Sequence, residues 1–452
     1  MSSRRQFLRN SAITLGGLML GAPAFADLNI SEKKKVIIIG AGFAGLAAAY
    51  RLHQRNIDFV VLEARNRIGG RVYSYNIDPD EDLIVELGAE WVGYSHERIR
   101  KLCNEFGLEL FNNQFKTRLI RNGTFKDKDQ WQYSQDWLRK FEELKNAYKG
   151  LSTEQQINMD KIDYWNYLRN NGCTGEDLEL NELLNSTDFG ESIRHVSAYS
   201  AMGEYVESND TNEMDLKIRG GNDSLAEQFR CAIGKNRIKT EHVVTQIHQD
   251  KNVRVTCANG AVFEGTDIIC AIPVYSAKNI NWSPGLPEEI SLAMNELQYA
   301  RINKNPLLFS ERFWKDESFD LVTDMPGHYF YHATKNQPSK KGVLISYAIG
   351  DKAPVIASQT NAYRAALTNL SFKPGFGNTA HLLEKQENYY WGADRYSHGA
   401  YALYGIGQWF GVLPVLSQRF ERTLFAGEHL SEKWQGFMEG AIETGEAAAE
   451  SI

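Results

Sequence analysis

The chain has 452 residues, 50 of them basic and 57 acidic, and a formal net charge of −7 at pH 7. This acidic balance argues against nucleic acid and anionic lipid as partners. The five cysteines show no C-x-x-C spacing and the ten histidines no H-E-x-x-H or H-x-x-E-H spacing, which argues against a disulfide framework and a metal site.

The first 26 residues are typical of an export signal. A positive stretch, SRRQFLRN at residues 3–10, precedes an apolar run over 11–22 and the small-residue site Ala24-Phe25-Ala26. The run is about a dozen residues long, short of the roughly 20 that a spanning helix needs. The paired arginines resemble the bacterial twin-arginine class, with an ordinary secretory signal as the alternative. We expect the twin-arginine export machinery as a partner, and a periplasmic or secreted protein without a stable membrane anchor.

A glycine-rich loop follows the first strand that the sequence predicts. Residues 35–39 are apolar and β-branched, which predicts a strand, and the alanine-rich residues 46–52 predict a helix. Between them, GAGFAG contains Gly40, Gly42 and Gly45. In such a loop the first glycine permits the tight turn, the second lets the backbone approach a pyrophosphate, and the third lets the helix pack closely on the sheet. The spacing therefore predicts dinucleotide binding.

An acidic residue follows at the distance that such a site requires. A second apolar run over residues 59–62 ends at Glu63, whose carboxylate can accept a hydrogen bond from a ribose hydroxyl. The segment EARNRIGGRVYS at 63–74 then adds a glycine pair and an arginine, for which a plain NAD enzyme has no use. It resembles the segment with which the flavin-containing amine oxidase family holds FAD. The resemblance assigns four of its residues to FAD: Glu63, Arg65, Gly70 and Arg71.

The resemblance to this family, which includes monoamine oxidases, polyamine oxidases and many L-amino acid oxidases, extends through most of the chain. ELGAEWVG at 86–93 resembles the segment whose backbone, here Gly88 and Ala89, comes close to the flavin ring. RGGNDSLAEQF at 219–229 resembles the family's double-glycine turn into a helix. Val243 stands where the family makes a backbone contact to adenine.

The C-terminal segment is the most specific match. A strand over residues 253–257 and a turn at Asn259-Gly260 precede it in the family's order. From residue 422 onward, an apolar strand leads to Gly427 and Glu428, which the resemblance assigns to FAD. A helix opening near Gly440 would then point its N-terminus at the flavin's pyrimidine edge, where the helix dipole stabilises negative charge.

The implied fold is α/β, a two-domain FAD-linked amine oxidase fold. A doubly wound dinucleotide-binding domain is joined to a substrate domain of mixed sheet and helices. We expect the FAD-binding domain to comprise residues 27–75, 217–278 and 385–452, and the substrate-binding domain to comprise 76–216 and 279–384. Within the latter, residues 94–215 predict mostly helices, as over 136–151, and residues 300–350 predict strands.

One lysine is a candidate catalytic residue. INKNPLLFSERFW places Lys304 ten residues before Trp314, a spacing that resembles the family's lysine, which hydrogen bonds through a water to flavin N5. Because a buried ammonium is costly, we expect the pKa of Lys304 to fall, so that it can help activate oxygen or a relay water. The alternative is a strand-edge lysine that points to solvent.

Two rings are candidates for the walls of the family's aromatic cage. Tyr401 matches one wall, and Phe437 stands at the other, where monoamine oxidases have tyrosine; Trp434 is a third candidate. Facing rings would hold a neutral amine, exclude water and align its α carbon with flavin N5, although either ring could simply be core. Ala400 occupies the position of the monoamine oxidase cysteine that tethers the flavin, so the resemblance implies non-covalent FAD.

The resemblance implies an FAD-dependent oxidase that takes a hydride from the α carbon of an L-amino acid or a primary amine to flavin N5. The imine would hydrolyse to a carbonyl product and ammonia, and oxygen would reoxidise the flavin to give hydrogen peroxide. The expected partners are the amine or amino acid and oxygen, and a homodimer is left open. Three alternatives stay open: a polyamine oxidase, an FAD-dependent desaturase and a non-catalytic exported flavoprotein.

The sequence leaves the substrate class open. An amino acid oxidase needs a bidentate arginine for the substrate carboxylate, and many family members place it in a Gly-x-Met-Arg stretch, where this chain has GAEW at 88–91. Glu90 would instead suit a second ammonium. The substitute arginines are Arg118, Arg194 and Arg219. The two histidines that flank the flavin motifs, each either a base or a structural residue, are His398 and His429.

Overall fold

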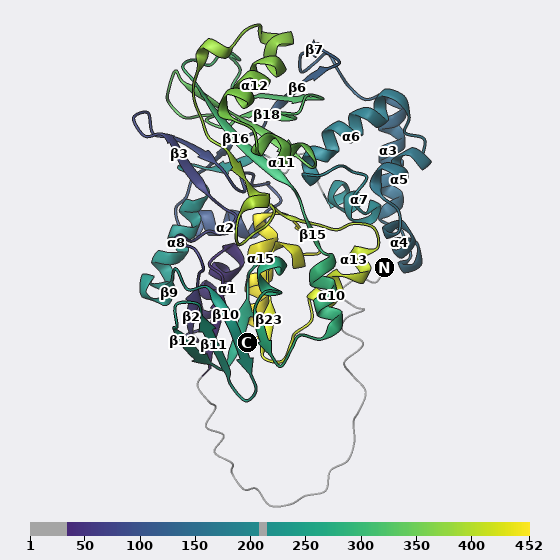
Figure 1. Cartoon of the computed structure of the whole chain (residues 1–452). Coiled ribbons are helices and arrows are strands. Elements are labelled where there is room, and N and C mark those ends of the chain that lie inside the picture. Colours follow the sequence, from purple (N-terminus) through teal and green to yellow (C-terminus); the bar gives the residue numbers. More distant parts are fainter. Residues whose placement is uncertain (1–33, 208–214) are drawn as a thin grey trace, which may run out of the picture. The chain divides into compact units, whose positions relative to one another are not determined.

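The structure is a computed structural model, and it describes residues 34–207 and 215–452 (Figure 1). The export signal predicted over the first 26 residues lies outside these ranges. Among the helices within them, none is long and apolar enough to cross a membrane.

Five parallel strands form the sheet that carries the glycine loop. Their order is β23 (Thr423–Phe425), β13 (Asp267–Cys270), β1 (Lys35–Ile39), β2 (Asp58–Leu62) and β9 (Ile238–Lys239). All but the first residue of β1 and of β2 are buried, because parallel strands are covered on both faces. The strand predicted over 35–39 is therefore confirmed. Strands far apart in the sequence meet in this sheet.

One face of the parallel sheet is covered by helices. These are α1 (Phe43–Gln54), α8 (Asp223–Ile233), α15 (Met438–Glu450) and α2 (Glu97–Glu105), which share an apolar core with β1 and β2. Gly445 of α15 lies directly on the backbone of α1, since a Cβ at this position would come within 2.1 Å of Ala44 O. The last helix is therefore packed tightly against the helix that follows the glycine loop.

The other face is covered by a four-stranded sheet and short helices. The sheet has the order β12 (Val262–Gly265), β11 (Val253–Cys257), β10 (Val244–Gln249) and β14 (Asn281–Ser283). The helices that share its core or adjoin it are α9 (Val274–Ala277), α10 (Glu288–Glu296), α13 (Gln408–Gly411) and α14 (Leu413–Leu416). Side chains of β1 and β2 alternate between this core and the helical one.

A mixed sheet of eight strands forms a second layer. Its order is β20 (Leu383–Gln386), β16 (Ile302–Phe309), β19 (Gly342–Ile349), β18 (Tyr329–His332), β17 (Phe319–Thr323), β6 (Lys116–Arg121) and β7 (Thr124–Lys126), with β21 (Tyr389–Tyr390) also on β16. One face packs with β3 (Ser74–Asp78) and β4 (Leu83–Glu86), and the other with α12 (Asn361–Phe376). α11 (Lys352–Ala357) lies beside β16 and β19. The strands predicted over 300–350 are confirmed.

A helical cluster precedes the second part of the mixed sheet in the chain. It contains α3 (Gln135–Tyr148), α4 (Thr153–Asp160), α5 (Tyr164–Asn170), α6 (Gly175–Phe189) and α7 (Ala198–Glu207). The Ser134 hydroxyl accepts from the Trp137 N–H at 3.2 Å and so caps α3, close to the start of the helix predicted over 136–151. The helical prediction for 94–215 is wrong at β5 (Leu110–Asn112), β6 and β7, where the chain joins sheets. The remaining pairs are β5 with β8 (Leu216–Ile218), and β15 (Gln298–Tyr299) with β22 (Ala402–Leu403).

Candidate active site

A cavity of about 460 Å³ runs from the glycine loop to the mixed sheet. This volume is within the range of small-molecule and cofactor sites. Fourteen of the predicted site residues line it: Gly40, Gly42, Glu63, Arg65, Gly70, Arg71, Gly88, Ala89, Val243, Lys304, Tyr401, Gly427, Glu428 and Phe437. Two do not, Gly45 and Trp434. Residues that are distant in the sequence are therefore brought to one cavity.

The glycine loop presents backbone rather than side chains to this cavity. Gly42 is the N-cap of α1, so the first N–H groups of the helix face the loop without intrahelical partners. Gly40 has φ +99°, which favours glycine. Gly45 lies beneath the loop, where an added Cβ would be 2.0 Å from Gly40 O. The absence of a side chain at Gly45 thus lets α1 begin directly against the turn.

The Glu63 carboxylate lies at the end of β2 and is 3% exposed. One oxygen accepts from the Ala41 N–H at 2.7 Å and the other from the Arg65 N–H at 2.8 Å. These bonds hold the carboxylate in the loop. Each oxygen retains a second lone pair, so the carboxylate can still accept from a ribose hydroxyl.

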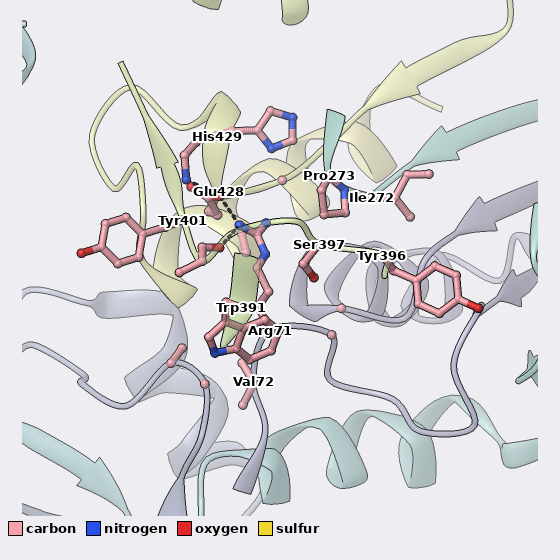
Figure 2. A pocket seen from close by; sticks show the side chains of 18 of the residues that line it. Arg71, Val72, Ile272, Pro273, Trp391, Tyr396, Ser397, Tyr401, Glu428 and His429 are labelled. Atoms are coloured by element: carbon pink, nitrogen blue, oxygen red, sulfur yellow. Dashed lines mark hydrogen bonds and ion pairs between the residues drawn. The ribbon is translucent and has the colours of Figure 1, made fainter. Parts of the chain in front are cut away.

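The second glycine pair packs on the first loop. The Gly69 N–H donates to Ala41 O at 2.8 Å, and a Cβ at Gly70, which has φ +60°, would be 3.1 Å from Gly42 Cα. Arg71 then reaches the centre of the cavity, where Figure 2 shows its guanidinium pointing at Glu428. Its Nη1 donates to Glu428 Oε1 at 2.7 Å and to Ala400 O. The EARNRIGGRVYS segment therefore joins the glycine loop to the C-terminal segment.

Glu428 fixes three parts of the cavity wall at once. Besides Arg71, its carboxylate accepts from the Ala402 N–H at 3.1 Å and from the Gly436 N–H at 2.9 Å. Arg65 is also paired, with Asp394 and with the Ser397 hydroxyl at 3.0 Å. Both predicted arginines thus have protein carboxylates as partners and line the cavity.

Lys304 points into the cavity and is 3% exposed, which contradicts the solvent-facing alternative. It alternates with Asn303 along β16, so that Ile302 and Lys304 share the cavity face. Its Nζ donates to Gly88 O at 2.7 Å, to Glu86 O at 3.1 Å and to Glu90 Oε2 at 3.2 Å. Burial lowers the pKa of Lys304, as predicted, although the Glu90 charge opposes the shift.

Glu90 is already occupied by two cations, which speaks against its predicted use for a second substrate ammonium. It is 1% exposed and accepts from Lys217 Nζ at 2.9 Å, from Lys304 and from the Tyr331 hydroxyl. Burial alone would raise the pKa of Glu90, but the two lysine charges and Tyr331 hold it below its usual value. A third cation at this carboxylate would be repelled by two lysine charges and attracted by only one negative charge.

The two predicted cage rings line the same end of the cavity. The Tyr401 hydroxyl donates to Asp188 O at 2.7 Å and lies 3.4 Å from the Tyr347 hydroxyl. Phe437 is the N-cap of α15. Both rings line the cavity, and no ring contact joins Tyr401 to Phe437 within the described ranges. Trp434 lies behind Phe437, at 6.3 Å between centroids, and against His96, which leaves it outside the cavity.

Of the two predicted histidines, only His429 lines the cavity. It is 3% exposed, and burial lowers its pKa to about 4, so the ring is neutral at physiological pH. His398 has φ +53° and does not line the cavity; it stacks, with 3.5 Å between ring centroids, on Tyr275, which does. A proton-accepting role therefore has geometric support at His429 alone.

Sequence reasoning missed Asp188, Tyr347 and Trp391. Asp188 lies in the last turn of α6 and lines the cavity, where its carboxylate accepts from the Tyr205 hydroxyl at 2.9 Å. Its side chain is accessible from the cavity, but protein surrounds the carboxyl group. The resulting desolvation raises the pKa of Asp188 to about 6. Trp391 donates to Leu87 O at 2.7 Å. An aspartate within a polar helix gives no sequence signal, because only the packing of α6 turns it inward.

The three arginines predicted as carboxylate ligands all lie elsewhere. Arg118 pairs with Asp127 and Asp316. Arg219 pairs with Glu109 in an exposed, bidentate arrangement, and Arg194 covers the Trp165 ring at 3.8 Å. None of the three lines the cavity.

A parallel sheet with a glycine loop, an acid at the end of β2 and a cavity that continues to a buried lysine is typical of a dinucleotide-binding protein. The family model for flavin containing amine oxidoreductase matches residues 43–452. The chain therefore belongs to the flavin-containing amine oxidoreductase family.

Curated relatives cover nearly the whole chain. Flavin-containing amine oxidase B of Sus scrofa is 28% identical over 464 residues, which cover 94% of this chain and 86% of that protein. Its Homo sapiens counterpart is 26% identical over the same length and coverage.

Solved structures share the fold. Cyclohexylamine oxidase from Brevibacterium oxydans IH-35A has a TM-score of 0.82 at 21% identity and covers 93% of this chain and 98% of its own. Putrescine oxidase bound to putrescine has a TM-score of 0.82 at 19% identity, with the same coverage. The predicted fold class is thereby confirmed; the domain boundaries and the roles of the site residues stay predictions.

The cavity fits the flavin dinucleotide that the family implies. Gly40, Gly42 and Gly70 leave bare backbone at one end, beside the N-terminus of α1, as a pyrophosphate requires. At the other end, Gly88 lies so close to the Arg71 backbone that a Cβ would be 2.0 Å from Arg71 O. The dinucleotide end and the lysine end are parts of one continuous space.

Proposed function

We propose that this chain is an FAD-dependent oxidase of amines that lack a carboxylate, giving an imine that hydrolyses to a carbonyl product and ammonia, with hydrogen peroxide formed from oxygen. The observation that carries the proposal is the charge of the substrate end of the cavity. Two acidic residues, Asp188 and Glu204, line this end beside Tyr401. The arginines that line the cavity belong instead to the segment after the glycine loop and to the segment next to Asp394; they are Arg65, Arg71 and Arg395. A substrate carboxylate would meet acidic side chains there.

The chain's own residues would bind and orient the amine. The bound flavin would supply the hydride acceptor. Tyr401 and Phe437 would hold the guest between their rings and keep water out. Burial raises the pKa of Tyr401 well above its usual value, so its hydroxyl stays protonated and donates to Asp188 O. Lys304 would place its Nζ, which three hydrogen bonds hold in position, beside the flavin ring.

Anaerobic reduction tests the proposal. The purified protein, with its flavin spectrum recorded, is mixed without oxygen with phenethylamine, L-phenylalanine and putrescine. The first two differ only in the carboxylate, so bleaching by phenethylamine and not by L-phenylalanine supports the proposal. Bleaching by L-phenylalanine alone contradicts it, and a flavin that no amino compound reduces favours a non-catalytic flavoprotein.

The flavin should leave the protein on acid denaturation, because Ala400 offers no sulfur for a tether. We expect all of the yellow colour in the supernatant after trichloroacetic acid precipitation, and an FAD peak on chromatography. Colour that stays with the pellet would show a covalent bond at another residue.

Asp188→Asn should reduce the preference for amine over amino acid. The ionised carboxylate repels a substrate carboxylate, so we expect the phenethylamine to L-phenylalanine ratio of kcat/KM to fall about tenfold, or ~1.4 kcal/mol. Because the pKa of Asp188 is about 6, the wild-type ratio of the two kcat/KM values should be highest above pH 7 and should decline as the pH falls through 6. Comparing variant and wild type at each pH cancels the titration of the substrates.

The matched control is Asp136→Asn, whose side chain is 89% exposed on α3. It should leave the ratio unchanged. An Asp188→Asn variant with the wild-type ratio at pH 8 would contradict the electrostatic explanation.

A further inference from the structure

A buried cluster of four charged side chains lies behind Lys304. Glu86 and Glu90 come from the end of β4 and the segment after it, Lys217 from β8 and Lys304 from β16; none is more than 3% exposed. Among them Lys304 and Glu90 line the cavity, while Lys217 and Glu86 do not. The cluster therefore has one side toward the flavin and one side within the protein.

The hydrogen bonds of Lys304 match its charged form. An ammonium has three N–H donors, and Nζ has three acceptors within 3.2 Å: two backbone carbonyls, Glu86 O and Gly88 O, and the Glu90 carboxylate. A neutral amine would have only two donors for these acceptors. The geometry thus favours the ammonium, in opposition to the cost of burial.

Lys217 is the second cation on Glu90. It donates to Glu90 Oε1 at 2.9 Å and to Ala333 O at 3.2 Å, while Lys304 binds the other carboxylate oxygen. Lys217 therefore competes with Lys304 for the same negative charge. Its own charge also disfavours the charge on Lys304.

The other groups that face Lys304 do not replace Glu90. Burial raises the pKa of Glu86 to about 7, and its carboxylate accepts from the Asn222 N–H at 2.9 Å and the Ser74 hydroxyl at 2.8 Å. Burial also raises the pKa of Tyr331 and Tyr347, whose rings flank Nζ, so both stay neutral. Glu90 is the ionised acid that touches Lys304.

We propose that Glu90 and Lys217 are positioning residues that together set the charge of Lys304 at the flavin end of the cavity, Glu90 by favouring the ammonium and Lys217 by limiting that effect. This inference rests on the proposed function in one respect, that the flavin lies against Lys304. Replacing a residue that only fills space would not shift the charge of Lys304 in a defined direction. Removing the charge of Glu90 should favour the neutral amine of Lys304, and removing the charge of Lys217 should favour its ammonium.

The visible absorbance of the bound flavin, recorded between pH 5.5 and 10, reports a charge that changes beside the ring. In the wild type we expect a transition that belongs to Lys304, separate from that of the Glu86 carboxyl group near pH 7. Glu90→Gln removes the negative charge and keeps the shape, so the midpoint should fall by about one pH unit or more. The double variant Glu90→Gln with Lys304→Met should lose the transition, which assigns it to Lys304.

Lys217→Met provides the opposite arm. It removes a cation outside the cavity and leaves Glu90 to Lys304 alone, so the midpoint should rise, while Tyr331 still donates to the carboxylate. This variant decides the matter if Glu90→Gln fails to fold. The proposal would be overturned if the midpoints of Glu90→Gln and Lys217→Met moved in the same direction or did not move. It would also be overturned if the absorbance of every protein stayed constant over this pH range.

The same samples separate this inference from the proposed function. If no amine bleaches the flavin but the midpoints move oppositely, the positioning role stands and the substrate proposal fails. If amines bleach the flavin and the midpoints stay fixed, the substrate proposal stands and the positioning role fails. Protein that binds no flavin would overturn both.

Discussion

Replacing Gly45 by alanine is expected to yield a colourless protein. The added Cβ would lie 2.0 Å from Gly40 O and 3.1 Å from its carbonyl carbon, so the loop or α1 must move. Overpacking of this kind costs about 1–3 kcal/mol or more, and here the displaced backbone is the part that would contact the pyrophosphate. We expect loss of flavin absorbance after purification and a lower free energy of unfolding in urea.

The control for this variant is Gly285→Ala. Gly285 has no positive φ, and a Cβ there meets no atom within 4 Å. The control protein should be as yellow and as stable as the wild type. A Gly45→Ala protein that retains stoichiometric flavin would refute the close-packing explanation for this glycine.

Replacing Lys304 by methionine is expected to slow the reaction with oxygen by about 100-fold. Loss of one preorganised charged donor at a reacting centre typically has an effect of this size. Glu90 would keep Lys217 and Tyr331 as partners, so the variant should still fold. The measurement is stopped-flow reoxidation of protein reduced with dithionite, which requires no amine substrate.

Lys335→Met is the matched control, since Lys335 is also buried, at 7% exposure, and does not line the cavity. Its Nζ donates to Gln114 O at 2.6 Å, and Gln114 does not line the cavity either. The control should reoxidise at the wild-type rate. Equal rates in Lys304→Met and wild type would remove Lys304 from the chemistry with oxygen.

The dinucleotide end could be predicted because its determinants are local. Gly40, Gly42 and Gly45 act within one turn, and β1 and α1 on either side have clear periodicity. Lys304 could be predicted only through the family resemblance, since nothing in its neighbours separates a buried lysine from an exposed one. The alternation along β16 then explains why it faces the cavity.

The substrate end could not be predicted because tertiary packing decides it. Asp188 faces the cavity only because α6 ends there, and Glu90 meets Lys217 only because β8 lies beside its loop. Sequence reasoning therefore assigned Glu90 to a substrate and left Lys217 out. Trp434 is a predicted cage residue because it is close to Phe437 in the sequence. In the structure it packs behind Phe437, just before α15 begins, and does not line the cavity.

The parallel sheet also dictates when the cofactor can be taken up during biosynthesis. Its strands come from residues 35–62, 238–270 and 423–425. The helix α15 follows them in the chain and packs through Gly445 on α1, the helix after the glycine loop. A nascent polypeptide on the ribosome therefore lacks the edge strand β23 and the covering helix α15 until translation has passed residue 450. We expect stable cofactor uptake to follow translation, which is the order of events that a twin-arginine leader, proposed from residues 3–10, would serve.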